Sequence, residues 1–304
     1  MDKAKPRVAV IGAGTMGCGI AAGFVAQGCD VVLLLRDAAR ANACQASTLA
    51  LAESLHGAQA PGVLGVHALD TFDAWAALTL VIESINEDLL RKQQLFAWLE
   101  PRVPAAVPIG SNSSGFAISR IAQGLATRSR MFGMHYFMPA HQVPLVEVVL
   151  GADSDAALAQ QVCAMFAAAG KKPVLVKRDI AGFLANRIQH ALMREVLSLI
   201  DSGIASVEDI DIAVRYSFGF RYAACGPVLQ KEISGWESMA TAAREIYPTL
   251  SNTAVLATCL EQRLTEGKFG MKTGEGFLKW TPEAALAARA DYSQRLSAAL
   301  RLLE

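Results

Sequence analysis

Short apolar segments alternate with stretches of helical periodicity through the first half of the chain. Fully buried parallel strands are continuous apolar runs of this length, and helices normally connect them. The pattern therefore predicts a doubly wound parallel sheet of the α/β class. Its strands are expected at 8–11, 31–35, 80–85 and 107–111, with further strands at 131–135, 145–149 and 174–176.

The pattern changes after Asp179, where the remaining apolar positions recur at helical spacing. The first of these helices is predicted over 181–202 and stops at Gly203. Others are expected at 206–216, 227–245, 252–266 and 282–302. We therefore predict two domains, an α/β domain over 1–179 and an all-helical domain over 180–304.

The first predicted strand runs directly into a Gly12-x-Gly14-x-x-Gly17 motif, and a helical pattern follows. Glycines at this spacing allow a tight turn and a close approach of a pyrophosphate to the backbone. The helix N-terminus adds N–H groups and a positive dipole end. The motif predicts a Rossmann-type dinucleotide site, and the alternative is a glycine-rich turn that only shapes a βα unit.

Composition and charge narrow the function classes. The chain carries 28 basic and 28 acidic residues, and this balance argues against a nucleic-acid surface. No apolar run approaches the ~20 residues of a membrane span. The six cysteines form no CxxC pair or metal-ligand spacing, and the first strand begins by residue 8. We expect a cytoplasmic protein without a metal site or signal peptide.

Candidate chemistry gathers at the ends of the predicted strands. His135 ends one strand, Glu147 lies twelve residues further on, and the polar loop 111–115 follows another strand. A carboxylate beside an imidazole can hold its tautomer and raise its pKa, which suits a general base for alcohol oxidation. Asn186, on the first helix of the second domain, can donate to a substrate. The alternatives are a satisfied core histidine, an N-capping loop and an asparagine that only ties helix to sheet.

These residues resemble the L-3-hydroxyacyl-CoA dehydrogenase family over nearly the whole chain. The resemblance rests on five blocks in the expected order: the GAGTMG loop, Ser-Asn-Ser-Ser, His135 with Val-Pro-Leu-Val-Glu147, residues 181–187, and residues 268–276. It implies interconversion of a 3-hydroxyacyl group, as a thioester or a free acid, with its 3-keto form. His135 is implied as base, Glu147 as its partner, and Ser114 and Asn186 as ligands of the substrate oxygen. A homodimer built by the helical domain is implied too.

The chain departs from the family pattern in two places. Met138 replaces an expected Asn, and the stretch between Leu35 and Leu80 is short and free of lysine, which leaves little charge for a coenzyme A phosphate. The Val-Pro-Leu-Val-Glu block and residues 219–227 resemble the branch that acts on free hydroxy acids such as gulonate and carnitine. Arg221 in that segment can pair with a substrate carboxylate or simply be solvated.

The end of the second strand bears on the cofactor. NAD sites place a carboxylate there, but this chain has Leu35 followed by Arg36, which can grip a 2′-phosphate. We therefore expect NADP to be favoured over NAD, while Asp37 keeps NAD open. The predicted cofactor contacts are Gly12, Gly14, Thr15, Met16, Gly17, Arg36, Glu87 and Asn112.

Two other functions compete. The β-hydroxyacid dehydrogenases share the glycine loop but rely on a lysine that the helix 181–202 lacks. A dehydrogenase fold kept as a nucleotide sensor or structural protein is the second alternative, and Met138 is its main support.

Overall fold

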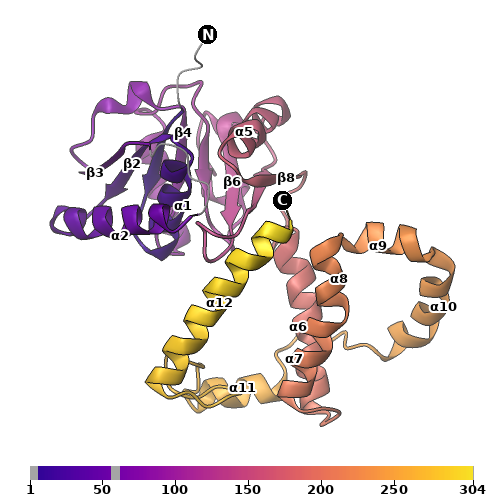
Figure 1. Cartoon of the computed structure of the whole chain (residues 1–304). Helices are drawn as coiled ribbons and strands as arrows, with labels where there is room; N and C mark the ends of the chain where they lie inside the picture. The colour runs from indigo at the N-terminus through magenta and orange to yellow at the C-terminus, as the bar shows by residue number, and fades with distance from the viewer. Residues whose placement is uncertain (1–5, 56–61, 304) are drawn as a thin grey trace. The chain divides into compact units, whose positions relative to one another are not determined.

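The computed structural model describes residues 6–55 and 62–303. Its internal contacts divide the chain into two compact units, Met1–Arg187 and Ile188–Glu304. The first unit holds a sheet flanked by helices, and the second is built from helices (Figure 1). This confirms the predicted fold class, a Rossmann-type α/β sheet followed by an all-helical region.

The eight strands of the first unit form one sheet in the order β3-β2-β1-β4-β5-β6-β7-β8. Every neighbouring pair is parallel except β6 and β7, which are antiparallel. The reversal follows from the short connection between these two strands, since parallel strands need a longer crossover. The strands are β1 (Arg7–Ile11), β2 (Asp30–Leu35), β3 (Leu64–Ala68), β4 (Leu80–Glu83), β5 (Ile109–Ser111), β6 (Met131–Tyr136), β7 (Leu145–Leu150) and β8 (Lys172–Val176).

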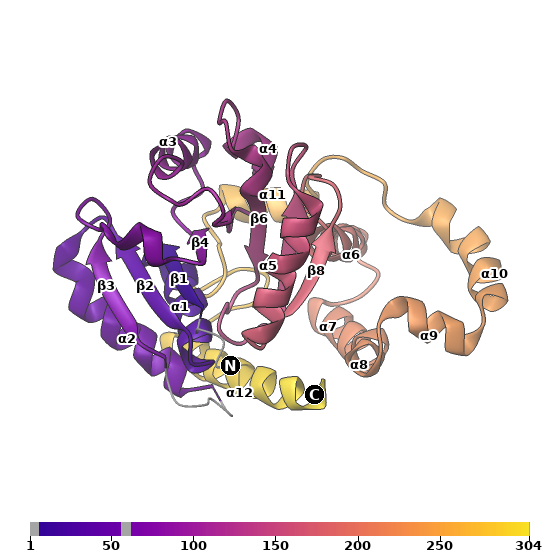
Figure 2. The same ribbon diagram turned by 90° about the horizontal axis from the view of Figure 1, so that it is seen from above.

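Helices cover both faces of this sheet (Figure 2). One face carries α1 (Thr15–Ala26), α2 (Ala41–Glu53) and α5 (Ala156–Ala168), and the other carries α3 (Leu89–Leu99) and the short α4 (Ile118–Ile121). Alternate residues of β1 enter the two cores: Val8 packs with α1 and α2, and Ala9 packs with α3. Both faces of the central strands are therefore buried, as their continuous apolar sequences predict. Single turns of 3-10 helix lie at η1 (Ala38–Arg40), η2 (Ala74–Ala77) and η3 (Arg128–Arg130).

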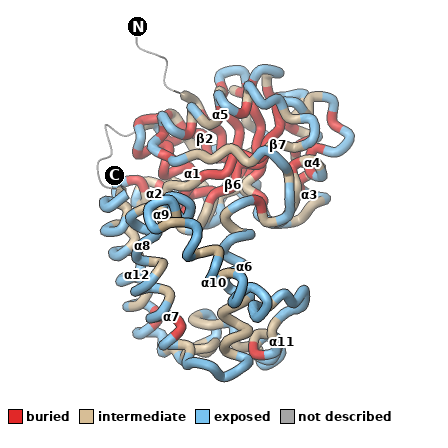
Figure 3. Tube along the Cα trace, turned by 90° about the vertical axis from the view of Figure 1, so that its right-hand side faces the viewer, coloured by how far each residue is buried: buried red, intermediate tan, exposed pale blue. Residues whose placement is uncertain are grey.

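The second unit begins within α6 (Ala185–Asp201), whose first turn belongs to the first unit. Asp201, the last residue of α6, accepts hydrogen bonds from the N–H groups of Thr258 and Cys259. These bonds hold the helix that begins at Thr258 against the end of α6. The tube in Figure 3 shows how much of these helices is exposed. They are α7 (Val207–Tyr216), α8 (Phe218–Ala224), α9 (Pro227–Ser234), α10 (Trp236–Ile246), η4 (Tyr247–Thr249), α11 (Thr258–Thr265) and α12 (Pro282–Leu302).

Several elements differ from the sequence-based expectation. The helix α8 was not predicted, and the helix expected over 252–266 begins at Thr258. The helix expected over 227–245 is two helices, because Gly235 adopts a left-handed φ of 86° between α9 and α10. The strand β3 was not predicted, since Leu-Gly-Val-His-Ala shows neither a continuous apolar run nor a clear alternation. It forms because the edge of β2 offers it a parallel partner. Across the described residues, no helix combines the length and apolarity that a bilayer crossing requires.

Candidate active site

His135 and Glu147 face each other across the antiparallel strands β6 and β7, where they form a register pair. The His135 Nδ1 lies 2.8 Å from Glu147 Oε2, and the two side chains are 4% and 0% exposed. Directly opposed residues on antiparallel strands have adjacent side chains, so the pairing of these strands is what brings the two residues together. Sequence spacing alone left their adjacency conditional on the strand order.

The second oxygen of Glu147 is also engaged. Oε1 accepts hydrogen bonds from the backbone N–H of Leu184 at 3.0 Å and of Ala185 at 2.8 Å, at the start of α6. Burial on its own raises the pKa of the Glu147 carboxyl, but the hydrogen bonds from His135, Ala185 and Leu184 outweigh it and hold this pKa below its usual value. Glu147 is therefore ionised, and as a carboxylate it can only accept. It follows that His135 Nδ1 carries the proton that it donates.

Two aromatic side chains pack on the imidazole. The ring of Phe137 lies 4.5 Å from the His135 ring between centroids, and that of Phe183 lies 5.3 Å away. Phe183 has a left-handed φ of 49°, directly after Gly182 at 73°. A bulky residue in this region is strained, and such strain persists only where the surroundings impose it. This turn places Phe183 on the imidazole and the first amides of α6 on Glu147.

The polar loop after β5 is fastened on two sides. Asn112 accepts a hydrogen bond from the backbone N–H of Tyr136 at 2.9 Å and donates to Ser84 Oγ at 3.2 Å. Ser113 Oγ donates to Glu87 Oε1, which also accepts from the Gly115 N–H at 2.9 Å. Asn112 thus joins this loop to the strand of His135, one residue beyond the imidazole.

The remaining predicted ligands are less engaged. Ser114 is exposed, and its hydroxyl has no hydrogen bond to the residues that the structure describes. Asn186 is half-buried on the first turn of α6, likewise without a side-chain bond in the described ranges 6–55 and 62–303. Both side chains remain available to a ligand, and their roles stay predictions.

Sequence reasoning missed a buried ion pair beneath the polar loop. Glu83, at the end of β4, is 0% exposed and accepts from Lys92 Nζ at 2.7 Å and from Ser111 Oγ at 2.6 Å. Lys92 also lies 3.3 Å from the Glu87 carboxylate, which helps to lower the pKa of Glu87 against the effect of burial. The only available signal was Glu83 at the carboxyl end of a strand, where α/β sheets bind ligands. Glu87 therefore supports the loop as well as being a predicted cofactor contact.

The glycine loop fits the dinucleotide that its sequence predicts. Gly12 has a φ of 107°, and a methyl group there would lie 2.5 Å from Ser84 O. A methyl group at Gly17 would lie 1.7 Å from Gly12 O, so only glycine permits this turn. The space around Gly14 is open, with no atom within 4 Å of such a methyl group, and Thr15 is exposed. No side chain caps the N-terminus of α1, which leaves its N–H groups free for phosphate oxygens.

Arg36 and Asp37 lie where β2 ends, and both are exposed. The Asp37 carboxylate accepts a hydrogen bond from the Ala39 N–H at 3.1 Å and so caps the short helix η1. The carboxylate that keeps NAD open is thus already engaged, but it is accessible. Met16, also a predicted cofactor contact, is partly buried against the core of α1 and α2.

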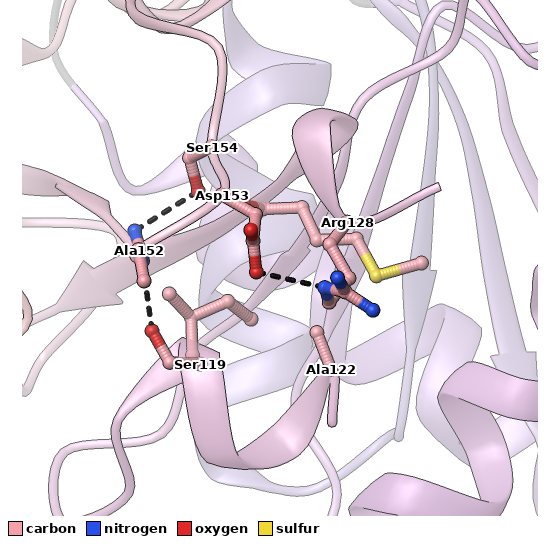
Figure 4. Close-up of a pocket in the computed structure, with 9 residues that line it drawn as sticks. Ser119, Ala122, Arg128, Ala152, Asp153 and Ser154 are labelled. Carbon is pink, nitrogen blue, oxygen red and sulfur yellow. Dashed lines mark hydrogen bonds and ion pairs between the residues drawn. The ribbon is translucent and has the colours of Figure 1, made fainter. Parts of the chain in front are cut away.

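A separate hollow on the first unit is too small for a substrate. It lies between α4 and the turn after β7, with a volume of about 10 Å³, which is room for one water molecule at most. Figure 4 shows its lining, where Arg128 pairs with Asp153 at 2.7 Å and Ser119 Oγ accepts from the Ala152 N–H. This hollow is therefore not a candidate active site, and the candidate residues are those around His135.

A glycine cradle, a buried His–Glu pair and a polar loop at one edge of a Rossmann-type sheet define a nucleotide-dependent oxidoreductase. Comparison with known families specifies this class further. Residues 7–180 match the NAD binding domain of 3-hydroxyacyl-CoA dehydrogenase, and residues 182–280 match its C-terminal domain. The chain belongs to the 3-hydroxyacyl-CoA dehydrogenase family, as the sequence motifs predict, and it is an oxidoreductase.

Individual relatives cover the chain to different extents. It is 31% identical to the 5-formyl-3-hydroxy-2-methylpyridine 4-carboxylate 5-dehydrogenase of Mesorhizobium japonicum, with 98% of each chain covered. A crystal structure of a dehydrogenase of this name, described as an NAD⁺-dependent dismutase, superposes with a TM-score of 0.91 at 28% identity and 98% coverage of both chains. The L-carnitine dehydrogenase of Nocardiopsis dassonvillei is 36% identical over 76% of this chain and 71% of its own.

Proposed function

We propose that the protein interconverts a hydroxyl and a carbonyl group of a small hydroxy acid or 3-hydroxyacyl group, with His135 as acid and base. The buried His135–Glu147 hydrogen bond of 2.8 Å carries this proposal. Glu147 keeps the Nδ1 proton in place, so Nε2 presents its lone pair for the hydroxyl proton. Among the described residues Nε2 has no hydrogen-bond partner that competes for this lone pair.

The proton is moved by residues of this chain. During oxidation the hydroxyl proton passes to His135 Nε2, and the Glu147 carboxylate stabilises the imidazolium that forms. In the reverse direction the imidazolium returns this proton to the oxygen. Ser114 and Asn186 are proposed to donate hydrogen bonds to the same oxygen. A nicotinamide bound at the glycine loop supplies the remaining chemistry, which is to accept or give a hydride.

The choice of cofactor rests on two opposing lines of support. The family domain that matches is an NAD binding domain, and the pyridine carboxylate dehydrogenase is described as NAD⁺-dependent. The residues of this chain favour NADP, because Leu35 stands in the place of the ribose-binding carboxylate and the exposed Arg36 follows it. We propose that the protein prefers NADP, and this preference is supported by these two residues alone. Titration with NADPH and NADH tests it, and tighter binding of NADH would overturn it.

The substrate is proposed to be a free acid. Two relatives with high coverage are named for free acids, a pyridine carboxylate and carnitine. The described parts of the stretch between β2 and β4 carry no lysine that could hold a coenzyme A phosphate. A panel of 3-hydroxy and 3-keto compounds, as free acids and thioesters and with both cofactors, tests this. Aromatic hydroxy and formyl carboxylates extend the panel, and activity on thioesters alone would overturn the free-acid assignment.

A second copy of the chain is the proposed partner of the helical unit. The described part of this unit contains an apolar groove of about 550 Å³ lined by α6, α7 and Phe277. Ile212, Tyr216 and Met193 in this groove are large, apolar and exposed, at 56%, 72% and 39%. Monomers rarely leave such surface in water, so it supports the expected homodimer. We expect a dimeric mass by light scattering, and a monomer at all concentrations would refute the assignment.

The catalytic assignment is tested with His135→Ala, using the exposed His190→Ala as the matched control. Loss of the base is expected to lower kcat by about 10²–10⁴-fold. Binding of the cofactor, followed by nicotinamide fluorescence, is expected to stay unchanged because the glycine loop is intact. Wild-type turnover in His135→Ala on the best substrate of the panel would refute the assignment and favour a nucleotide-binding protein without catalysis.

A further inference from the structure

A buried lysine outside the proposed catalytic set contacts the chain next to it. Lys171 lies between α5 and β8 and is only 9% exposed. Its Nζ donates hydrogen bonds to the backbone oxygens of Ala140 at 2.6 Å and Val143 at 3.0 Å. It also lies 5.7 Å from the ring centroid of Tyr136, the residue after His135. Among the described residues, no carboxylate oxygen lies within 4.0 Å of this ammonium group.

The two carbonyl groups belong to the segment 137–144, which connects β6 to β7. This segment begins two residues after His135 and ends three residues before Glu147. Inside it, Pro139 O accepts hydrogen bonds from the N–H groups of Gln142 and Val143. The segment is thus a compact turn that Lys171 holds from outside. It connects the two strands on which His135 and Glu147 form a register pair.

The same segment packs on the helix that follows the glycine loop. A methyl group at Gly19 of α1 would lie 3.2 Å from Ala140 Cβ and 3.4 Å from His141 N. A methyl group at Gly23 would lie 3.6 Å from Lys171 Cε. The two glycines, one helical turn apart, form a surface that receives both the segment and the lysine stem. Lys171 therefore contacts the cofactor-binding helix and the catalytic hairpin together.

Burying the Lys171 ammonium group without a carboxylate partner costs desolvation free energy. Burial lowers the pKa of Lys171 from 10.5 to about 8. The charged or titratable groups beside it are Tyr136, whose pKa burial raises, and His141, whose pKa is lowered by burial and by the Lys171 charge. The facing helices α1 and α5 carry no charged residue. An apolar side chain would avoid this desolvation but would leave two carbonyl oxygens unpaired.

We propose that Lys171 is a positioning residue that clamps the segment 137–144 against α1 and so holds His135 and Glu147 in register with the bound cofactor. It does not touch the reacting atoms. This inference rests on the proposed catalytic role of His135. It predicts an effect on turnover rather than on substrate affinity, because a small displacement of a catalytic group is costly to the reaction itself.

The test compares Lys171→Met and Lys171→Arg with Lys172→Met in the full-length protein. Lys172 is the matched control, because its side chain is exposed and only its backbone N–H reaches the segment, at Pro144 O. Hydrogen exchange of the amides in 137–147 is measured by mass spectrometry without cofactor, and kcat and KM are measured on the best substrate. If Lys171→Met does not fold, Lys171→Gln replaces it, since one amide can donate to at least one of the two carbonyl groups.

The clamp predicts faster exchange in 137–147 for Lys171→Met, a kcat about 10- to 100-fold lower, and a KM within about twofold of wild type. Lys171→Arg is expected to recover part of kcat, because the guanidinium keeps the charge and the donors. Lys172→Met should match wild type. Unchanged exchange in Lys171→Met would overturn the clamp whatever His135→Ala shows, and so would faster exchange with unchanged kcat. If His135→Ala keeps wild-type turnover while Lys171→Met shows faster exchange, the role of His135 as base is refuted. The contact of Lys171 with the segment 137–144 is then still supported.

Discussion

The two units of the molecule differ in which side chains they bury and which they expose. The first unit encloses two apolar cores and also buries charged side chains with partners, among them Glu83, Lys92 and Glu147. In the described part of the second unit, only three hydrophobic side chains are buried: Ile210, Cys259 and Ala285. Many of its large apolar side chains are exposed instead. Buried, partnered charges are typical of a functional site, whereas the exposed apolar side chains support the proposed interface with a second copy of the chain.

Removing the Glu147 carboxylate from the first unit is expected to give the largest effect. Glu147→Ala leaves His135 Nδ1 and the backbone amides of Leu184 and Ala185 without an acceptor. We expect kcat to fall by about 10²–10⁴-fold and the free energy of unfolding to fall by roughly 3 kcal/mol. Steady-state kinetics and urea titration measure the two losses. Glu147→Gln is the control, since its amide oxygen can still accept from α6, so it should lose activity with a smaller loss of stability.

A charge placed on the apolar groove tests the second unit. Ile212→Glu introduces a carboxylate at a position whose side chain is 56% exposed in the single chain. Val63→Glu, at a position of the first unit that is 67% exposed, is the control. Burying an unpaired carboxylate in an interface costs about 3 kcal/mol, so dimerisation should weaken more than 100-fold in Ile212→Glu only. Sedimentation over a range of concentrations measures this. Equal association of the two variants would remove the contrast between the units.

The pH dependence of stability isolates the buried charge at Lys171. Burial penalises the ammonium form, so the unfolded chain binds this proton more tightly than the folded chain, with a pKa of 10.5 against about 8. Stability contributed by this residue therefore rises as the pH rises from 8 to 10.5, by about 3 kcal/mol. Chemical unfolding of wild type and Lys171→Met at pH 7.5 and 10.5 measures the difference. A rise of equal size in both proteins would show that Lys171 keeps its ordinary pKa.

The smallest expected effect concerns cofactor choice at the end of β2. Arg36→Ala should weaken binding of NADPH by about tenfold and leave NADH unchanged, because a guanidinium recognises only the added phosphate. Arg102→Ala, three residues after the end of α3, is the control. Titration of both variants by protein fluorescence provides the measurement. An equal loss for both cofactors would mean that Arg36 does not read the 2′-phosphate.

Much of the first unit could be predicted because its signals are local. A continuous apolar run that ends in glycines predicts β1, the loop and α1 whatever lies around them. The strand β3 could not be predicted, because its residues become a strand only through pairing with β2. The split between α9 and α10 depends on one backbone angle at Gly235, and the helical period of the flanking residues does not reveal it.

Some residues of the candidate site could likewise be predicted from the sequence, and others could not. His135 and Glu147 were predicted as candidates from their residue types and the family motifs, and their roles remain proposals. The buried Lys92 was missed because a lysine on a helix resembles a solvated charge, and only the fold shows its pairing with Glu83. Lys171 was missed because a lysine in a short connection also resembles a solvated charge, and only the fold shows that it is buried against Ala140 and Val143.

The sequence by itself determined the class of sheet, the glycine cradle and the family, since each follows from local periodicity or from motifs in a set order. The tertiary structure alone decided which charges meet: the antiparallel pairing of β6 and β7 joins His135 to Glu147, and the start of α6 holds the second oxygen of that carboxylate. Such contacts join residues far apart in the chain. They depend on strand order, register and burial, which no local stretch of sequence encodes.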